Sequence, residues 1–443
     1  MLFRSTGEEG DAFVFEPDYW YKGVNDILNK KKYNCFSFNV TQPTAAVSVK
    51  KTLAQMEQTV AGFGLNMSPE YTTLTAARAA SSPNSYCIIT VQGYKRVRFP
   101  SLNSSIFGAA FIDASGNIIS RMKAVSSAGM INGMYLFSDI PQGAVKLAFT
   151  IFNRAPFDYV LLTNSLDIEA IEPDWVKHEA CLTGMYEAYL LDDKLYSRSG
   201  VISTGLISQA DFKNYASLRG VGFQLVDYDM SKDVANLFYA KYGNRDSQGQ
   251  CGYGTNTNLL VSGLTNTMGM LDTINPNNAT DGAFWKDANN NLVNKQAVNC
   301  MGYETWFGNK AEWMDDVYFN TPTSNGVWNI GKSGNIRYLQ GLNNAGETYP
   351  IAIIGGRYMD IVGASVDGST STYYYDYQAI SGSTGRVVYR SSTSASAGGG
   401  VAYLYTNFDS SFAASGIGSR LAFRGAIVWA QSVSAYKALT AIA

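Results

Sequence analysis

The sequence GYETWFGN at residues 302–309, followed by EWMDDV at residues 312–317, sets two tryptophans into a stretch that is otherwise rich in Gly, Asn and Thr. Residues 248–349 contain tryptophans at positions 285, 306, 313 and 328. Side chains of this size are mostly buried in folded proteins. We therefore expect this part of the chain to form long loops that are ordered by buried aromatic rings.

Downstream, residues 358–416 contain many tyrosines among runs of Ser, Thr and Gly, and no Lys, Glu or Trp. Tyrosine offers a large and rigid contact surface, and Ser, Gly and Asn offer adaptable hydrogen bonds, as in a binding surface. A Tyr- and Ser-rich β-sheet surface without a partner has the same composition, because Tyr and Thr also favour strands. Apolar strand patterns at 350–357 and 419–429 flank the segment, so the sequence predicts a loop-like stretch held between two core strands.

The charge composition argues against one class of partner. The 443 residues include 34 Lys and Arg against 36 Asp and Glu, and no segment accumulates a basic stripe, so we expect no nucleic-acid partner. No apolar run is long enough to cross a bilayer, so membrane insertion is not expected. Residues 1–11 lack the apolar core of an export signal, so either the chain is used without secretion or the exporting segment lies outside this sequence.

The thiols and the single histidine limit the chemistry that the chain offers. The cysteines at positions 35, 87, 181, 251 and 300 are widely spaced and form no CxxC pair. We expect buried thiols, with a Cys251–Cys300 disulfide as the alternative. One histidine, His178, excludes a site built from several histidines. The sequence therefore predicts no catalytic residues, no metal site and no cofactor.

Sequence patterns divide the chain into three parts and predict an α+β fold that is mostly β. Residues 1–80 are expected to form an N-terminal assembly or linker region, with a helix at 47–63 because its apolar positions recur at helical spacing. Residues 81–166 carry short strand patterns separated by turn signals, which predicts a β-sandwich. Residues 167–443 form the last domain, with helices at 208–220 and 231–242.

Two turn-containing stretches of the sandwich carry a resemblance of their own. They are FIDASGNII at residues 111–119 and IPQGA at residues 140–144. They resemble the jelly-roll modules of carbohydrate-binding type that occur in tail fibres. A spacer sandwich without a ligand remains the alternative.

The tryptophan-containing stretch at 302–317 and the closing sequence SRLAFRG at 419–425 resemble the core of C-type lectin folds. With the framework GRVVYRS at 385–391, they make the last domain similar to the C-type-lectin-fold variable proteins of diversity-generating retroelements, whose fold formylglycine-generating enzymes share. In that family a reverse transcriptase rewrites adenines, so a variable Asn codon ending in C never becomes Lys, Glu, Gln, Met or Trp. Residues 373–416 follow this restriction except at Gln378.

The resemblance implies a variable region at about 358–416 that contacts a ligand. The positions carried over as ligand contacts are Tyr373, Tyr374, Tyr375, Ser381, Ser392, Ser394, Tyr403, Tyr405, Asn407, Phe408 and Phe412. It also implies a receptor-binding protein of a phage tail, located in the virion tail as a homotrimer with other tail proteins. Such a protein binds a host cell-surface protein or glycan. A variable adhesin displayed on the bacterial cell surface is the alternative.

Other chemistries stay open as less favoured alternatives. A formylglycine-generating-type enzyme would need reactive thiols, for which Cys251 and Cys300 are the candidates in the middle of the domain. The acid pair at 315–316 suggests glycoside hydrolysis, although two solvated turn carboxylates are the favoured interpretation. A calcium-dependent lectin would need oxygen ligands such as Asp272 and Asp281, but the usual Glu-Pro-Asn or Gln-Pro-Asp loop is absent there.

Overall fold

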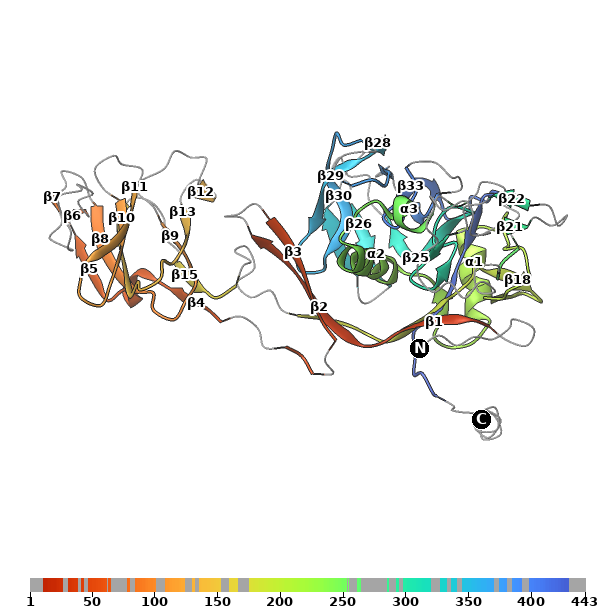
Figure 1. Cartoon of the computed structure of the whole chain (residues 1–443), viewed down its shortest axis with the longest axis horizontal. Coiled ribbons are helices and arrows are strands. Elements are labelled where there is room, and N and C mark those ends of the chain that lie inside the picture. The colour runs from red at the N-terminus through yellow and green to blue at the C-terminus, as the bar shows by residue number, and fades with distance from the viewer. Residues whose placement is uncertain are drawn as a thin grey trace. The chain divides into compact units, whose positions relative to one another are not determined.

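The computed structural model describes residues 11–26, 31–38, 41–43, 47–61, 63–64, 78–79, 84–100, 108–123, 130–131, 135–152, 159–165, 175–252, 254, 261–263, 285–286, 292–294, 298–319, 327–332, 336–340, 345–369, 374–380, 385–392 and 398–429. These residues form many short strands and three α-helices (Figure 1). The fold is therefore α+β and mostly β, as the sequence predicts.

Contacts between residues in space divide the chain into two compact units, where the sequence predicts three parts. One unit comprises Trp20–Val176 with Gly356–Tyr358, and the other comprises Met1–Tyr19, Lys177–Gly355 and Met359–Ala443. The region 1–80, expected as a separate part, is divided between them. Its first 19 residues belong with the C-terminal sequence, and the remainder belongs with the sandwich strands.

The unit built on Trp20–Val176 contains two five-stranded antiparallel sheets (Figure 1). The first has the order β11 (Ile118–Lys123), β10 (Gly108–Ile112), β14 (Lys146–Phe152), β8 (Asn84–Thr90) and β5 (Gln58–Ala61). The second has the order β12 (Met130–Ile131), β13 (Tyr135–Asp139), β9 (Arg96–Pro100), β15 (Val160–Thr163) and β4 (Ser48–Lys51). Phe149 of the first sheet and Phe99 and Leu162 of the second share one buried cluster, so the two sheets form a sandwich.

The prediction of a helix at 47–63 is wrong. This segment forms β4, a single 3-10 turn at Leu53–Gln55, and β5. Val49 lies opposite Leu162, and Val60 lies opposite Tyr86, in antiparallel ladders. Apolar residues at helical spacing can also occupy strand positions, and here pairing with distant strands decides the structure.

The other unit contains two sheets that bring distant parts of the sequence together (Figure 1). The four-stranded sheet has the order β1 (Phe13–Glu16), β17 (Cys181–Gly184), β35 (Leu421–Phe423) and β20 (Phe223–Leu225). The eight-stranded sheet runs β27 (Arg337–Gln340), β26 (Val327–Ile330), β25 (Ala311–Tyr318), β32 (Arg386–Arg390), β33 (Leu404–Asp409), β31 (Gln378–Ile380) and β28 (Ala345–Thr348). Its eighth strand, β34 (Ile417–Ser419), runs parallel to β25.

The remaining described strands form smaller sheets. They are β2 (Tyr19–Asp26), β3 (Lys31–Ser37), β6 (Phe63–Gly64), β7 (Arg78–Ala79), β16 (Val176–His178), β18 (Tyr189–Leu191), β19 (Lys194–Tyr196), β21 (Trp285–Lys286), β22 (Leu292–Asn294), β23 (Asn299–Cys300), β24 (Tyr303–Glu304), β29 (Pro350–Gly355) and β30 (Asp360–Val366). Most of them form two-stranded hairpins, so loops and short hairpins account for much of the C-terminal sequence.

The helices predicted at 208–220 and 231–242 are present. Helix α1 (Gln209–Ser217) is capped by Ser208, whose side chain accepts the Asp211 N–H. Helix α2 (Tyr228–Tyr242) begins three residues earlier than expected and ends at Gly243, which adopts a left-handed φ of 60°. The short α3 (Ser247–Cys251) follows, and α2 lies alongside β25 and β30 (Figure 1).

Two apolar clusters fill the unit around the eight-stranded sheet. One contains Trp306, Trp328 and Leu404, and the other contains Trp313 together with Phe212 of α1. These three tryptophans are fully buried, as expected, but Trp313 and Trp328 lie on strands β25 and β26 and not in loops. The side chain of the fourth, at position 285, lies outside the described residues.

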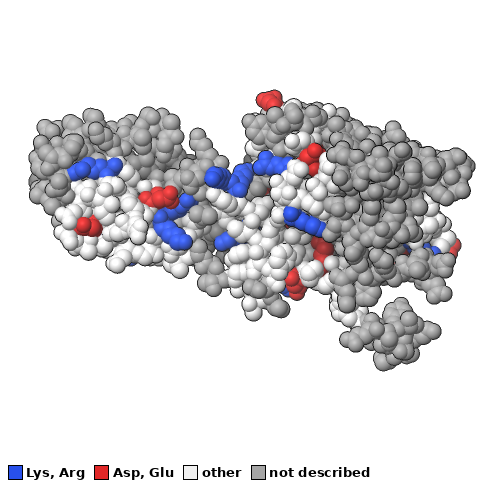
Figure 2. Space-filling view, in the orientation of Figure 1, with Lys and Arg blue, Asp and Glu red and all other residues white. Residues whose placement is uncertain are grey.

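Charged side chains lie in small groups on the face seen in Figure 2, where Lys and Arg occur close to Asp and Glu among uncharged residues. Some charged side chains of the described residues are paired, such as Lys146 with Glu57 at 3.0 Å. None of the described helices has the length and apolar character needed to cross a membrane.

Asp227 should stabilise the fold more than its position at a helix end suggests. Its Oδ1 atom accepts the Met230 N–H at 2.8 Å, and the guanidinium of Arg424 donates to both carboxylate oxygens. We expect Asp227→Ala to lower the free energy of unfolding by about 2 kcal/mol, measured by urea titration with circular dichroism. Asp227→Asn keeps the capping oxygen and should lose less. Equal losses for the two variants would contradict this assignment.

Candidate ligand-binding surface

A row of stacked aromatic rings follows β32 and β33. The rings of Tyr389 and Tyr405 are 4.9 Å apart and 15° from parallel. The Tyr405 and Phe408 rings are 5.8 Å apart, and Phe408 stacks on Phe412 at 3.8 Å and 5°. Tyr403 lies beside this pair, nearly parallel to both rings, with its centre 6.4 Å from the centres of Tyr389 and Tyr405. Each such pair adds about 0.5–1.5 kcal/mol to the burial of the rings, so the row is held in place by its own contacts.

The strand pattern explains why these rings share one face. Leu404 and Thr406 of β33 are buried, whereas Tyr405 and Asn407 alternate with them and are at least partly exposed. In the β32–β33 ladder, Tyr405 lies opposite Tyr389 and Phe408 lies opposite Val387, so two residues of β33 lie opposite one residue of β32 between these pairs. This bulge turns Phe408 toward the row.

Exposure increases along the row. Tyr389 and Tyr403 are only 8% and 5% exposed, whereas Tyr405, Phe408 and Phe412 are partly exposed. Asn407 is exposed, and its side-chain amide donates to the Tyr405 hydroxyl at 2.9 Å. The outer end of the row therefore offers aromatic faces, an amide and a phenol, which are the groups that protein-binding surfaces use.

The structure brings together five of the expected contact residues, namely Tyr403, Tyr405, Asn407, Phe408 and Phe412. Tyr403 is buried because it packs in the same cluster as helix α1, so it supports the outer rings instead of offering its own surface.

The remaining expected positions lie elsewhere or outside the described residues. Tyr374 is partly buried beside Tyr239, with the Arg245 guanidinium 4.3 Å from its ring centre. Tyr375 is also partly buried. Ser392 is 7% exposed, and its backbone carbonyl accepts the Gly308 N–H. The positions Tyr373, Ser381 and Ser394 fall outside the described residues.

Gln378, the one departure from the codon restriction, has a structural role. Its Oε1 atom accepts the Gly363 N–H at 2.7 Å, and its Nε2 atom donates to the carbonyls of Ile361 and Ala402 at 2.8 and 3.3 Å. The side chain is buried. A buried amide whose oxygen and nitrogen are both bonded belongs to the framework and not to a contact surface.

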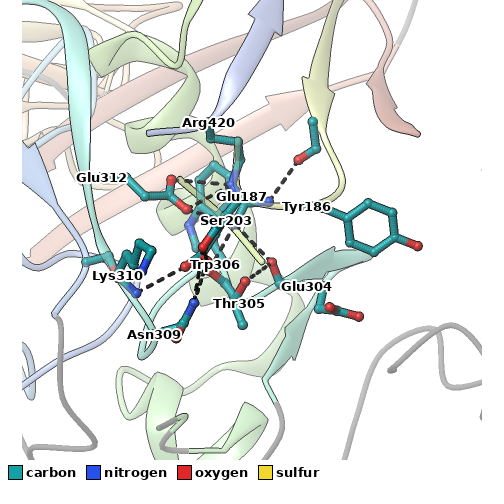
Figure 3. A network of polar contacts seen from close by, with 12 residues as sticks. Tyr186, Glu187, Ser203, Glu304, Thr305, Trp306, Asn309, Lys310, Glu312 and Arg420 are labelled. Atoms are coloured by element: carbon teal, nitrogen blue, oxygen red, sulfur yellow. Dashed lines mark hydrogen bonds and ion pairs between the residues drawn. The ribbon is translucent and has the colours of Figure 1, made fainter. Parts of the chain in front are cut away.

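A buried ionic network supports the sheet behind the aromatic row (Figure 3). Glu312 of β25 accepts hydrogen bonds from two arginines, Arg390 of β32 and Arg420. The Arg420 guanidinium also donates to the backbone carbonyls at 184–185 and 304–305, at 2.8–2.9 Å. It thereby joins segments that share no long ladder.

Arg390 contacts an aromatic ring as well as the Glu312 carboxylate. The Arg390 guanidinium lies 3.4 Å from the centre of the Trp306 ring and donates to the Trp306 carbonyl at 2.8 Å. Burial lowers the pKa of Arg390 to about 10, although the nearby Glu312 charge raises it. The guanidinium remains charged at neutral pH, because this pKa still lies well above 7.

A second buried carboxyl, Glu187, adjoins this network (Figure 3). Its Oε2 atom accepts hydrogen bonds from the Ser203 hydroxyl at 2.6 Å and the Asn309 amide at 2.5 Å. Its Oε1 atom accepts the Lys310 N–H at 3.1 Å. Burial and the nearby Glu312 charge raise the pKa of Glu187. These bonds fix the loop that precedes β25.

This network was not predicted from the sequence. A charged residue inside an apolar strand pattern was the available signal, as at Glu312 between Ala311 and Trp313.

The interpretation of the acid pair at 315–316 as two solvated turn carboxylates is wrong. Both residues are buried in β25 and point apart. Asp316 accepts the N–H of Tyr228 at the start of α2, while Asp315 pairs with two lysines.

The structure tests the predicted disulfide but not the predicted calcium ligands. All five cysteines are thiols, so the alternative of a Cys251–Cys300 disulfide is wrong. Both of these thiols are fully buried. The candidate calcium ligands Asp272 and Asp281 lie outside the described residues.

Comparisons with known proteins add no assignment. No protein-family model and no curated protein matches this chain.

Removing the Glu312 charge should strongly destabilise the protein. Glu312→Gln leaves the buried guanidinium groups of Arg390 and Arg420 uncompensated, and we expect the free energy of unfolding to fall by about 3–5 kcal/mol. Urea titration monitored by tryptophan fluorescence measures the change. Glu179→Gln, which removes an exposed carboxylate, is the matched control and should change it by less than about 0.5 kcal/mol. A loss below about 1 kcal/mol for Glu312→Gln would contradict the supporting role.

Asp376 should make stability depend on pH. Its Oδ2 atom accepts the Ala402 N–H at 2.7 Å, and burial raises its pKa well above the ordinary value of 3.8. Because the folded state binds the proton more tightly, this group favours folding most at low pH, and the benefit is lost as pH rises through the raised pKa. Asp376→Asn removes this loss.

The variant should therefore unfold at higher urea concentration than wild type at about pH 8, with the difference shrinking towards about pH 4. Midpoints of urea unfolding across this range measure the effect. A difference that is constant with pH would show that Asp376 does not titrate as described.

Proposed function

We propose that this chain is a receptor-binding protein of a phage tail, of the C-type-lectin-fold variable kind associated with diversity-generating retroelements. The observation that carries the proposal is the aromatic row, whose outer end leaves Tyr405, Phe408 and Phe412 partly exposed beside the exposed Asn407. In this proposal these side chains contact a protein or glycan on the host cell surface.

The chemistry of the row favours binding over catalysis. Its side chains provide aromatic surface and neutral hydrogen-bonding groups, whereas catalysis of acyl or glycosyl transfer needs a nucleophile or a positioned acid and base. The thiols of Cys251 and Cys300, which a formylglycine-generating-type enzyme would need, have no exposed surface. We therefore propose a protein that is not an enzyme.

The framework around the row supports membership of the variable family. The outward positions Tyr405, Asn407 and Phe408 carry residue types that the family's codon restriction allows, and Gln378, which it does not allow, is buried. Variation confined to outward positions would leave the buried residues of the same strands unchanged. This separation is what a replaceable contact surface on a fixed scaffold requires.

The size of the surface makes multivalency part of the proposal. A few exposed aromatic anchors contribute about 2 kcal/mol each when they are hot spots, which gives modest affinity for one copy. Three copies in a homotrimer, held by other tail proteins, would raise the avidity without new contacts. A bacterial surface adhesin would use the same surface, so localisation of the protein distinguishes the two roles.

The proposal predicts that the outer end of the row is required for attachment. The variant Tyr405→Ala/Asn407→Ala/Phe408→Ala should reduce adsorption to host cells by at least about 100-fold, because it removes two aromatic anchors and a polar contact. Purified protein and virions carrying the variant are both assayed for adsorption, with circular dichroism to verify folding.

Tyr338→Ala serves as the control, because Tyr338 is a 69% exposed tyrosine on β27, outside the row. It should leave adsorption unchanged. A folded triple variant that adsorbs as well as wild type would reject the binding surface. Immunogold labelling of bacterial cells but not of virions would favour the adhesin.

A further inference from the structure

The unit that contains β1 also contains a compact cluster of three potential metal ligands. Glu16 ends β1, His178 ends β16, and Cys181 begins β17. The Nε2 atom of His178 is 3.5 Å from Oε2 of Glu16 and 3.7 Å from Sγ of Cys181. One carboxylate oxygen, one ring nitrogen and one sulfur therefore lie within 4.8 Å of one another, and all three residues are buried.

These separations suit a single tetrahedral ion. With zinc–sulfur bonds of about 2.3 Å and zinc–nitrogen or zinc–oxygen bonds of about 2.0 Å, the ligand atoms of one site lie roughly 3.3–3.8 Å apart. The two separations at Nε2 fall in this range. Small side-chain rotations would bring the third pair of ligand atoms, Oε2 of Glu16 and Sγ of Cys181, into the same range.

Neighbouring residues orient the cluster as they do in known metal sites. Asp233 of α2 lies 2.7 Å from the Nδ1 atom of His178, which directs the lone pair of Nε2 toward the other two ligands. The ring of Tyr19 stacks on the imidazole at 4.4 Å and 13°. The Tyr303 hydroxyl donates to Oε1 of Glu16 and turns Oε2 toward the cluster.

An unsatisfied atom gives an independent indication of a ligand. Oε2 of Glu16 is buried and makes no hydrogen bond with any described residue. Buried carboxylate oxygens without a donor are costly, and most are bonded to protein, water or an ion. This oxygen points toward the imidazole nitrogen and the thiol, where a cation would satisfy it.

We propose that Glu16, His178 and Cys181 bind a divalent transition-metal ion of the zinc type as a structural site. Thiolate, imidazole and carboxylate together match zinc, with the fourth position left for a water molecule. The ion would compensate two negative charges, on Glu16 and on the Cys181 thiolate. The charge of Asp233 already has a partner in the buried Lys232 at 3.2 Å.

The geometry argues against the other use of these groups. A thiol next to an imidazole that is oriented by a carboxylate is also the order found at nucleophilic cysteines. Cys181 is 0% exposed, so a substrate could not reach its sulfur. A metal would instead fasten the N-terminal strand β1 to the β16–β17 turn. The expectation of no metal site rested on the single histidine and on the absence of a CxxC pair, and a site built from one carboxylate, one imidazole and one thiol escapes both arguments.

The first test uses the wild-type protein. After equilibration with zinc and dialysis, it should retain about one zinc ion per chain. Elemental analysis by mass spectrometry measures the zinc content. With cobalt(II) in place of zinc, it should show a thiolate-to-cobalt charge-transfer band. A chelator should lower its melting temperature. A wild-type protein that retains no zinc, or binds cobalt without the thiolate band, would overturn the proposal.

Variants assign the ligands. Cys181→Ser should lose the charge-transfer band and the effect of the chelator, whereas Cys251→Ser, which removes another buried thiol of the same unit, should keep both. Asp233→Asn should weaken zinc binding by about 10–100-fold while keeping the band at saturating cobalt, because Asp233 positions the imidazole without binding the ion. Loss of the band in Cys251→Ser, or its survival in Cys181→Ser, would refute the assignment.

Discussion

Glu312 sets a single carboxylate between Arg390 and Arg420 inside the protein, and the C-terminal sequence is assembled around this contact. A buried guanidinium without a counter-charge costs several kcal/mol, so the strands that supply the three side chains cannot separate cheaply. Arg420 also donates to carbonyls in the short segments at 184–185 and 304–305. Its hydrogen bonds replace the long ladders that these loop-rich segments lack.

This contact also fixes the surface on the other side of the same strands. Arg390 and Tyr389 are neighbours on β32, so their side chains point to opposite faces of the sheet. Arg390 lies opposite Leu404 in the ladder, and Tyr389 lies opposite Tyr405. Trp313, which follows Glu312 on β25, packs edge-on against Tyr389 at 5.6 Å. The charges therefore set the register that places the rings.

Local sequence signals predicted what local interactions decide. The caps Ser208 and Gly243 mark the ends of their helices, and turn residues separate the sandwich strands. The signals failed where distant pairing decides, as in the segment at 47–63. Composition identified the aromatic row but could not show that Tyr403 would be buried, because the face of a ring depends on strand register. Nor could it show that Glu312 meets Arg420, which lies 108 residues away.

The two faces of β33 explain how one strand can serve both stability and recognition. Leu404 and Thr406 are buried, and the backbone bonds to β31 and β32 do not depend on side-chain identity. Tyr405 and Asn407 point to the opposite face. A substitution there changes the surface that meets solvent or a ligand, and it leaves the core packing unchanged. Tyr389 and Tyr403 beneath them form a fixed aromatic base. A surface built in this way can change its partner without changing the fold that carries it.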